Sequence, residues 1–196
     1  MRTNRIEAFS DGVIAIIITV MVLEMKVPHG TDWNALVGVL PAFLTYVMSF
    51  VYLGIYWNNH HHMMHLCDGV NGRTLWANMH LLFWLSLVPF VTGWMGENHF
   101  AARPTALYGG VLVMAAVAYS ILQATIISQQ GKESQLKQAV GKDVKGKVSV
   151  LLYLAAIGLS FANRWIAIAL YVLVALIWLV PDRRIERHLE TSTADQ

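Results

Sequence analysis

Charged side chains are scarce along this chain of 196 residues. They make up only 13% of the sequence, whereas hydrophobic residues make up 56% and the mean hydropathy is +0.50. A soluble domain of this size carries roughly 25% charged residues. Several apolar runs reach the ~20 residues that a helix needs to cross a hydrocarbon core about 30 Å thick. The composition therefore predicts an all-α integral membrane protein.

Several chemical motifs are also missing. The single cysteine, Cys67, excludes an internal disulfide framework. The sequence has no paired carboxylates, no nucleophile elbow and no phosphate-binding glycine loop. We therefore expect no enzymatic activity, no cofactor and no nucleic-acid partner.

Six apolar segments and one polar segment divide the chain. We expect one six-helix domain over residues 1–181 and a charged tail over 182–196. Asn4 is expected to cap the first helix, with Glu7 reaching back in a capping box. The expected helices are Asn4 to Lys26, Trp33 to His60, Thr74 to Trp94 with a kink at Pro89, Pro104 to Ser128, 148–162 and 165–180, with a polar loop over 129–147.

Lysine and arginine are distributed unevenly between the two sides of this layout. Eleven of the 14 basic residues fall on the side that holds both termini, and only Lys26, Arg103 and Arg164 fall on the other. The positive-inside rule then places both termini in the cytoplasm of a multi-pass plasma-membrane protein. The basic loop and tail serve this topology, or else they bind lipid headgroups or a partner.

The first helix has two different faces. At about 100° per residue, Ile16, Val20 and Leu23 fall within about 60° of one another, with Gly12 nearly in line and Thr19 at the edge. Asp11 points about 140° away from Ile16. The apolar stripe is either an ordinary packing face or a surface that meets something else.

Asp11 needs a polar partner within the protein. A carboxylate at membrane depth costs at least ~2.5–3.5 kcal/mol, so it is rarely left unpaired. Several candidates lie near the same membrane boundary, and the sequence does not choose among them. They are Arg5, Trp57, His60, His61, Asn78 and His80.

The opening of the first helix carries a family resemblance. The segment RIEAFSD has the pattern Arg-x-x-x-Phe-Ser-Asp, is followed by GVIAIIITVMVLE, and has Thr19 eight residues after Asp11. It resembles the bacterial branch of the transmembrane protein 175 family of endosomal and lysosomal potassium channels. The six-span layout resembles that family across nearly the whole chain.

The resemblance implies a homotetramer around a central pore lined by the first helix of each subunit. It implies that Ile16 forms the constriction, that Val20 and Leu23 form further rings, and that Thr19 contributes to potassium preference. It also implies a hydrogen-bonded network that holds this helix. The corresponding residues here are Arg5, Phe9, Ser10, Asp11, Trp57 and His60.

An apolar ring of this kind predicts a weakly selective, leak-like channel. There is no Thr-Val-Gly-Tyr-Gly filter and no ladder of arginines that would form a voltage sensor. A narrow apolar neck blocks ions by expelling water, and a wider one passes partly hydrated potassium and other monovalent cations. Gly12 leaves room at the inner mouth. Glu24 is either a charge at the outer mouth or a solvated helix end paired with Lys26.

Three other interpretations stay open. His61 and His65 share a helix face beside the soft ligands Met63, Met64 and Cys67, which suggests a metal site or a cluster that responds to pH. Histidine near a helix end and methionine in a core equally account for the cluster. A proton-coupled transporter would use Asp11, His80 and Glu24 as a relay. A non-conducting membrane adaptor would use the basic loop.

Overall fold

The computed structural model describes residues 3–67, 69–131, 134–141 and 143–179. Within these ranges the chain forms helices and no strand, as the composition predicts. The predicted tail at 182–196 and the domain boundary at residue 181 lie outside the described residues. The helices are α1 (Asn4–Leu23), α2 (Trp33–His65), α3 (Gly72–Ser86), α4 (Val88–Glu97), α5 (Ala102–Gln130), α6 (Gln135–Val140), α7 (Val144–Ser160) and α8 (Arg164–Leu179).

Four helical segments of the described chain are long and apolar enough to cross a membrane. They are α1, α2, α3 together with α4, and α5. The predicted multi-pass membrane protein is therefore supported. The last two predicted spans correspond to α7 and α8, which have 17 and 16 residues and follow each other through a tight turn.

The third span is interrupted at Leu87, between α3 and α4. Pro89 lacks an N–H group, and its ring crowds the carbonyl group four residues earlier. The Leu87 N–H therefore bonds back to Trp84 O over 3.3 Å, and a new helix starts when Val91 N donates to Leu87 O over 3.2 Å. At the predicted kink the helix is thus interrupted at Leu87, two residues before Pro89.

The polar segment at 129–147 contains helices where a loop was expected. Ser134 Oγ accepts a hydrogen bond from Lys137 N at 3.2 Å, which caps the short helix α6. Leu136 of α6 is buried against the bundle. Asp143 caps α7 through Gly146 N at 3.2 Å, so this helix begins four residues earlier than predicted. The expectation of a bare loop was wrong because Ser134 and Asp143 are both capping residues.

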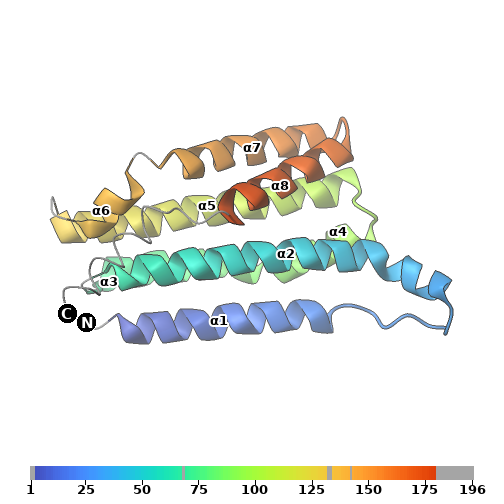
Figure 1. Ribbon diagram of the computed structural model, residues 1–196, viewed down its shortest axis with the longest axis horizontal. Coiled ribbons are helices and arrows are strands. Elements are labelled where there is room, and N and C mark those ends of the chain that lie inside the picture. Colours follow the sequence, from blue (N-terminus) through green and yellow to red (C-terminus); the bar gives the residue numbers. More distant parts are fainter. Residues whose placement is uncertain (1–2, 68, 132–133, 142, 180–196) are drawn as a thin grey trace.

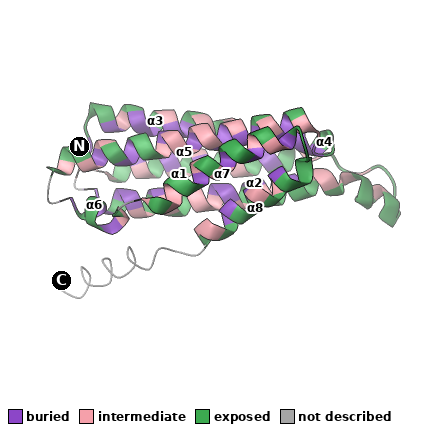
Figure 2. Ribbon diagram, turned by 90° about the horizontal axis from the view of Figure 1, so that it is seen from above, coloured by how far each residue is buried: buried purple, intermediate pink, exposed green. Residues whose placement is uncertain are grey.

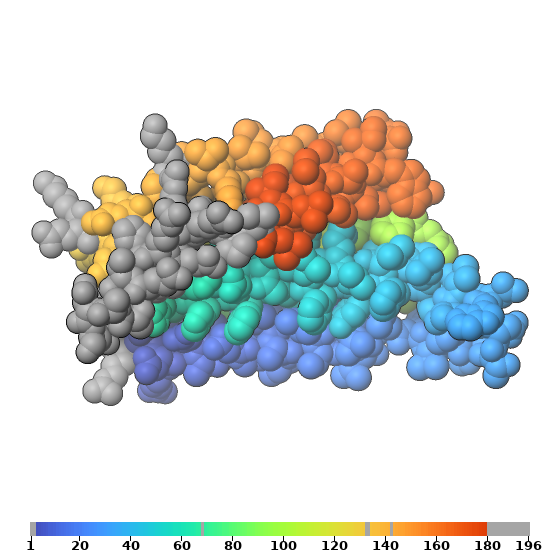
Figure 3. Space-filling model, in the orientation of Figure 1, coloured from blue at the N-terminus to red at the C-terminus, as the bar shows by residue number. Residues whose placement is uncertain are grey.

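The helices lie side by side in an elongated bundle (Figure 1). α1 forms one edge and contacts α2, α3 and α4, whereas α7 packs on α5 and α8 at the opposite edge (Figures 1 and 3). Buried residues gather on the inner faces of the helices (Figure 2). Described basic residues at the end with the N-terminus are Arg5, Arg73, Lys137, Lys145 and Lys147, and those at the other end are Lys26, Arg103 and Arg164.

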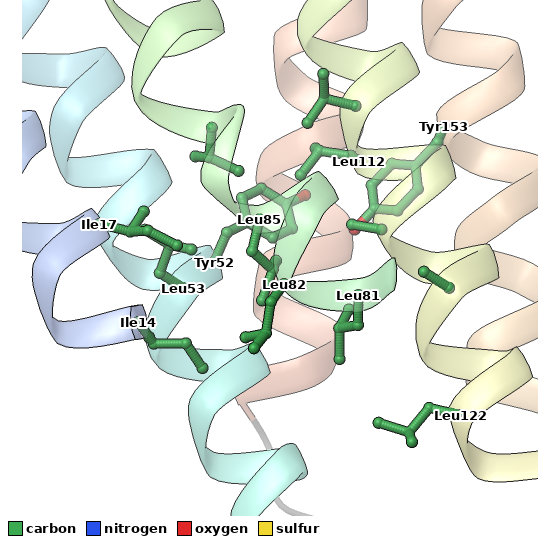
Figure 4. Packing of buried hydrophobic residues seen from close by; sticks show 14 of the residues in the cluster. Ile14, Ile17, Tyr52, Leu53, Leu81, Leu82, Leu85, Leu112, Leu122 and Tyr153 are labelled. Carbon is green, nitrogen blue, oxygen red and sulfur yellow. The ribbon is translucent and has the colours of Figure 1, made fainter. Parts of the chain in front are cut away.

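The centre of the bundle lies away from α1. Tyr52, Tyr108, Tyr153 and Tyr171 meet there, and Tyr52 OH donates to Tyr171 O over 2.6 Å. Gly109 is required at this point, because a Cβ atom there would collide with the Tyr171 side chain. α1 contributes Ile14 and Ile17 at one side of the buried cluster (Figure 4).

Candidate functional site on the first helix

One face of α1 is buried in the bundle. Its fully buried residues recur every three or four positions, which is the spacing of a single helix face. Ile14 and Ile17 point toward Leu53 of α2 (Figure 4). This face attaches α1 to the rest of the subunit. Its residues are Ile6, Ser10, Ile14, Ile17 and Met21.

A buried chain of hydrogen bonds joins α1, α3 and α2. Ser10 Oγ donates to Ile6 O over 2.8 Å and accepts from Asn78 Nδ2 over 3.0 Å. Asn78 Oδ1 then faces His60 Nε2 at 2.8 Å, so Nε2 carries the proton and donates. His60 Nδ1 is buried and has no hydrogen-bond partner among the described residues. Asn78 is therefore the link that joins α1 to α2 through α3.

Two further hydrogen bonds connect α1 to the end of α2. Trp57 Nε1 donates to Asp11 Oδ1 over 3.0 Å. His61 Nδ1 lies 2.8 Å from Glu7 Oε1. The predicted capping box was wrong: helix α1 begins after Thr3, no side chain caps it, and the Glu7 carboxylate is held by His61 instead.

The other residues predicted for this network or as partners of Asp11 form no hydrogen bond with the Asp11 side chain among the described residues. Arg5 is exposed and forms no hydrogen bond or ion pair within the described chain. Phe9 is 52% exposed and has no polar atom to offer. Asn78 bonds to both His60 and Ser10, whereas His80 Nε2 accepts from the Trp84 indole at 3.0 Å. Asp11 therefore has Trp57 as its hydrogen-bond partner.

The opposite face of α1 is bare and almost entirely apolar. Ile16 is 62% exposed, Val20 37% and Leu23 81%. Gly12 lies in the same row, with open space where a Cβ atom would be. Thr19 is exposed beside this row, and its hydroxyl group donates to Ile16 O over 2.9 Å. Ile16, Val20 and Leu23, which helix geometry groups as one stripe, thus share an exposed face of the subunit.

Lys26, which follows α1, pairs with a different acid from the one that the sequence suggested. Lys26 Nζ lies 2.7 Å from Glu97 Oε1 at the end of α4, and this contact raises the pKa of Lys26. The expected pairing of Lys26 with Glu24 was therefore wrong. Glu24 is the exposed C-terminal cap residue of α1, beyond Leu23.

The residues of the histidine cluster lie on two different sides of α2. His61 and His65 stack with ring centroids 6.3 Å apart, on the exposed side of α2. Met63, Met64 and Cys67 are buried on the other side. No group of three or more metal-ligating side chains occurs in the described chain.

A proton relay through the predicted groups lacks continuity. Asp11 and Glu24 are 13 residues apart on α1. This separation corresponds to about 20 Å along the helix axis. The side chain of His80 bonds to Trp84 and to neither carboxylate. The geometry therefore disfavours a transporter that moves protons through these three residues.

The role of Asn78 could not be assigned from the sequence. It belonged to a larger set of candidate partners for Asp11, whereas it bonds to Ser10, the residue before Asp11 in the chain. The available signal was its position: an amide early in an apolar helix needs a buried partner. That signal predicts a hydrogen bond but not which of two adjacent polar residues receives it.

The fold and this helix together define a class, that of α-helical multi-pass membrane proteins with one apolar helix face left bare. Residues 5–89 match the family described as Endosomal/lysosomal potassium channel TMEM175. A protein from Chryseobacterium sp. (strain P1-3), named as a potassium channel, is 55% identical over 190 residues, covering 97% of this chain and 99% of the relative. This chain therefore belongs to the TMEM175 family, as its first helix predicts.

More distant relatives share the same architecture. A protein from Streptomyces collinus, also named as a potassium channel, is 30% identical and covers 90% of this chain and 91% of its own. The crystal structure of a lysosomal potassium-selective channel TMEM175 homolog from Chamaesiphon minutus matches with a TM-score of 0.81 and 28% identity, over 92% of this chain and 97% of that one. Membership of a channel family also confirms that the chain is not an enzyme.

Proposed function

We propose that this chain forms a potassium-permeable channel, in which four identical subunits surround a pore lined by the bare face of α1. The observation that carries this proposal is the row of exposed Ile16, Val20 and Leu23 on a helix whose opposite face is packed and hydrogen-bonded. The names of the bacterial relatives as potassium channels support the choice of ion.

In this proposal each subunit crosses the plasma membrane six times, with α7 and α8 as the last two spans. The concentration of basic residues at the end that holds the N-terminus supports cytoplasmic termini. A single subunit has too few helices to enclose an aqueous pore, so identical copies must meet around a shared axis. The number four comes from the family resemblance. The partners are thus further copies of the chain, the bilayer and monovalent cations, with no cofactor.

Four copies of Ile16 form the constriction, followed outward by rings of Val20 and Leu23. When this neck is narrow it excludes water, and ions cannot cross because they would lose most of their hydration. When it widens slightly, potassium passes more easily than sodium because potassium gives up water at lower cost. The result is a leak-like channel with modest potassium selectivity.

Thr19 is suited to assist at this neck. Its hydroxyl hydrogen is used within α1, on the carbonyl group of Ile16 at 2.9 Å. Both lone pairs of the hydroxyl oxygen remain as acceptors on this exposed residue, where they can replace water around a passing cation. Thr19 thus offers oxygen at the level of the apolar rings without adding a charge.

The two mouths differ in character. Gly12 leaves space for a hydrated cation on the cytoplasmic side, since no atom lies within 4 Å of the position its Cβ would take. At the other end, Lys26 is neutralised by Glu97, so the charge of Glu24 is not cancelled by its basic neighbour. Glu24 can therefore concentrate cations at the outer mouth.

The experiment is a flux assay on purified protein in liposomes, with a potassium gradient as the sole driving force. We expect passive potassium flux that exceeds sodium flux. Ile16→Asn should raise it by about tenfold, the effect of lowering a barrier by about 1.4 kcal/mol. The matched control is Leu151→Asn, because Leu151 is an equally exposed aliphatic residue on α7 (66% exposed, against 62% for Ile16). Flux that requires a proton gradient would favour a transporter, and no flux from any variant would favour an adaptor.

A further inference from the structure

A cavity lies between α2, α5, α7 and α8, on the side of the subunit away from α1. It is partly open to the outside. Its lining residues come from these four helices and the residue that caps α7, and α1 contributes none among the described residues. The cavity is therefore separate from the candidate pore.

Five of the twelve residues that line the cavity are aromatic. Tyr56 and Tyr119 meet edge to face with centroids 6.2 Å apart, and Tyr52 and Tyr153 are also 6.2 Å apart. Trp178 Nε1 is held by Ser149 Oγ at 2.8 Å. These contacts fix the rings before any ligand arrives, so the walls are preformed. Preformed aromatic walls favour poorly hydrated organic cations over hydrated metal ions.

One acidic group, Asp143, lines the same cavity. Its Oδ1 accepts from Gly146 N at 3.2 Å, and it forms no ion pair with a described residue. Gly146 permits this arrangement, because a Cβ atom there would lie 2.6 Å from both carboxylate oxygens. Burial raises the pKa of the Asp143 carboxyl group, and the Gly146 N–H and the charge of Lys147 oppose that rise.

The acid and the deeper rings are separated along the cavity. Asp143 precedes Tyr153 by ten residues on the same helix. This spacing corresponds to about 15 Å. Asn59, Ser120 and Ser149 line the cavity as well, and its other walls are formed by aromatic rings together with Ile55, Ala116 and Gly146. A ligand that matches these two parts of the cavity has a positive group near the acid and an apolar body near the aromatic rings.

We propose that this cavity binds an organic cation, an ammonium group carried on a small apolar body, with the charge near Asp143 and Tyr119 and the body between Tyr56, Tyr153 and Trp178. The proposal depends on the cavity and not on the function proposed for α1. The ammonium group can belong either to a free amine or to a lipid headgroup, since the recognising chemistry is the same.

The test is binding of benzyltrimethylammonium to the full-length protein in an uncharged maltoside detergent, followed by isothermal titration calorimetry. Benzenesulfonate, which has a similar ring and the opposite charge, serves as the ligand control. Asp143→Asn keeps the hydrogen-bond acceptor for Gly146 and should weaken binding about tenfold, or by about 1.4 kcal/mol. Tyr56→Leu should also weaken it, whereas Tyr119→Phe, which keeps the ring, should leave it nearly unchanged.

Two control variants test whether binding is specific to this cavity. Glu97→Gln removes a carboxylate at the opposite end of the bundle, and Ile16→Ala alters the candidate pore; both should bind as the parent does. Thermal unfolding of each variant checks that it is folded. The proposal would be overturned if benzyltrimethylammonium did not bind saturably or if benzenesulfonate bound equally well. It would also be overturned if Ile16→Ala abolished binding and Asp143→Asn did not.

A competition arm identifies the source of the ammonium group. Displacement of the probe by dihexanoylphosphatidylcholine at concentrations where free choline has no effect would identify a lipid headgroup. Displacement by free choline would identify a free amine. Either result supports the site, and failure of both competitors together with an unaltered Asp143→Asn titration contradicts it.

Discussion

The two faces of α1 differ in almost every property except their hydrophobicity. The inner face carries Ser10, which is completely buried and hydrogen-bonded, between aliphatic residues that pack on the bundle. The outer face carries Ile16 and Leu23, which are bare in the subunit although they are just as apolar. The comparison teaches that apolar character alone does not decide which face of α1 packs inside the subunit. The polar residues decide it, because they require partners that only the bundle interior supplies.

The largest contrast is expected between two adjacent isoleucines. Ile17→Ala removes a side chain that is 5% exposed on the inner face, and should lower the stability of the subunit by about 2–5 kcal/mol. Ile16→Ala removes one that is 62% exposed, and should leave that stability within about 0.5 kcal/mol. Thermal unfolding in detergent, followed by tryptophan fluorescence, measures both. Equal losses of stability for the two variants would contradict the difference between the two faces.

A second, somewhat smaller effect is expected at Asn78. Asn78→Ala leaves His60 and Ser10 without the amide that joins them, and should cost about 2–4 kcal/mol because buried polar groups lose their partners. Asn58→Ala, at an exposed position on α2, is the matched control and should cost less than about 0.5 kcal/mol. The same unfolding assay ranks the two. A tolerated Asn78→Ala would mean that packing alone attaches α1.

The smallest effect is expected at Trp57. Trp57→Phe removes the donor to Asp11 but keeps an aromatic ring, and should lower stability by about 1 kcal/mol because the site is partly exposed. Trp76→Phe is the control, since Trp76 is 76% exposed on α3. If the Trp57 variant unfolds at the same temperature as the Trp76 variant, the Asp11 contact contributes nothing to holding the helix.

Much of the fold could be predicted because it depends on local pattern. The first four apolar runs, the break near Pro89 and the grouping of Ile16, Val20 and Leu23 all follow from hydropathy and helix geometry. The helix α6 was missed because a run of polar residues hides the capping role of Ser134 and the buried Leu136. Local pattern is weak wherever a short helix depends on tertiary packing.

The pairings within the site could not be predicted for a different reason. Asn78 and Ser10 are 68 residues apart, and Lys26 and Glu97 are 71 apart. In each case a second polar residue offered similar chemistry: Asp11, next to Ser10, was an alternative partner for Asn78, and Glu24, two residues before Lys26, was an alternative to Glu97. Choosing between such neighbours requires the relative rotation of two helices, and hydropathy does not specify that rotation.

The most direct test of a pore lined by α1 is cysteine cross-linking on this helix in membranes, with Cys67 replaced by serine. If the bare face of α1 surrounds a shared axis, Ile16→Cys should form disulfide-linked dimers between subunits under mild oxidation, whereas Leu151→Cys on α7 should not. The result that would contradict such a pore is the reverse: no cross-link at position 16 in protein that is assembled and folded, with efficient cross-linking at position 151.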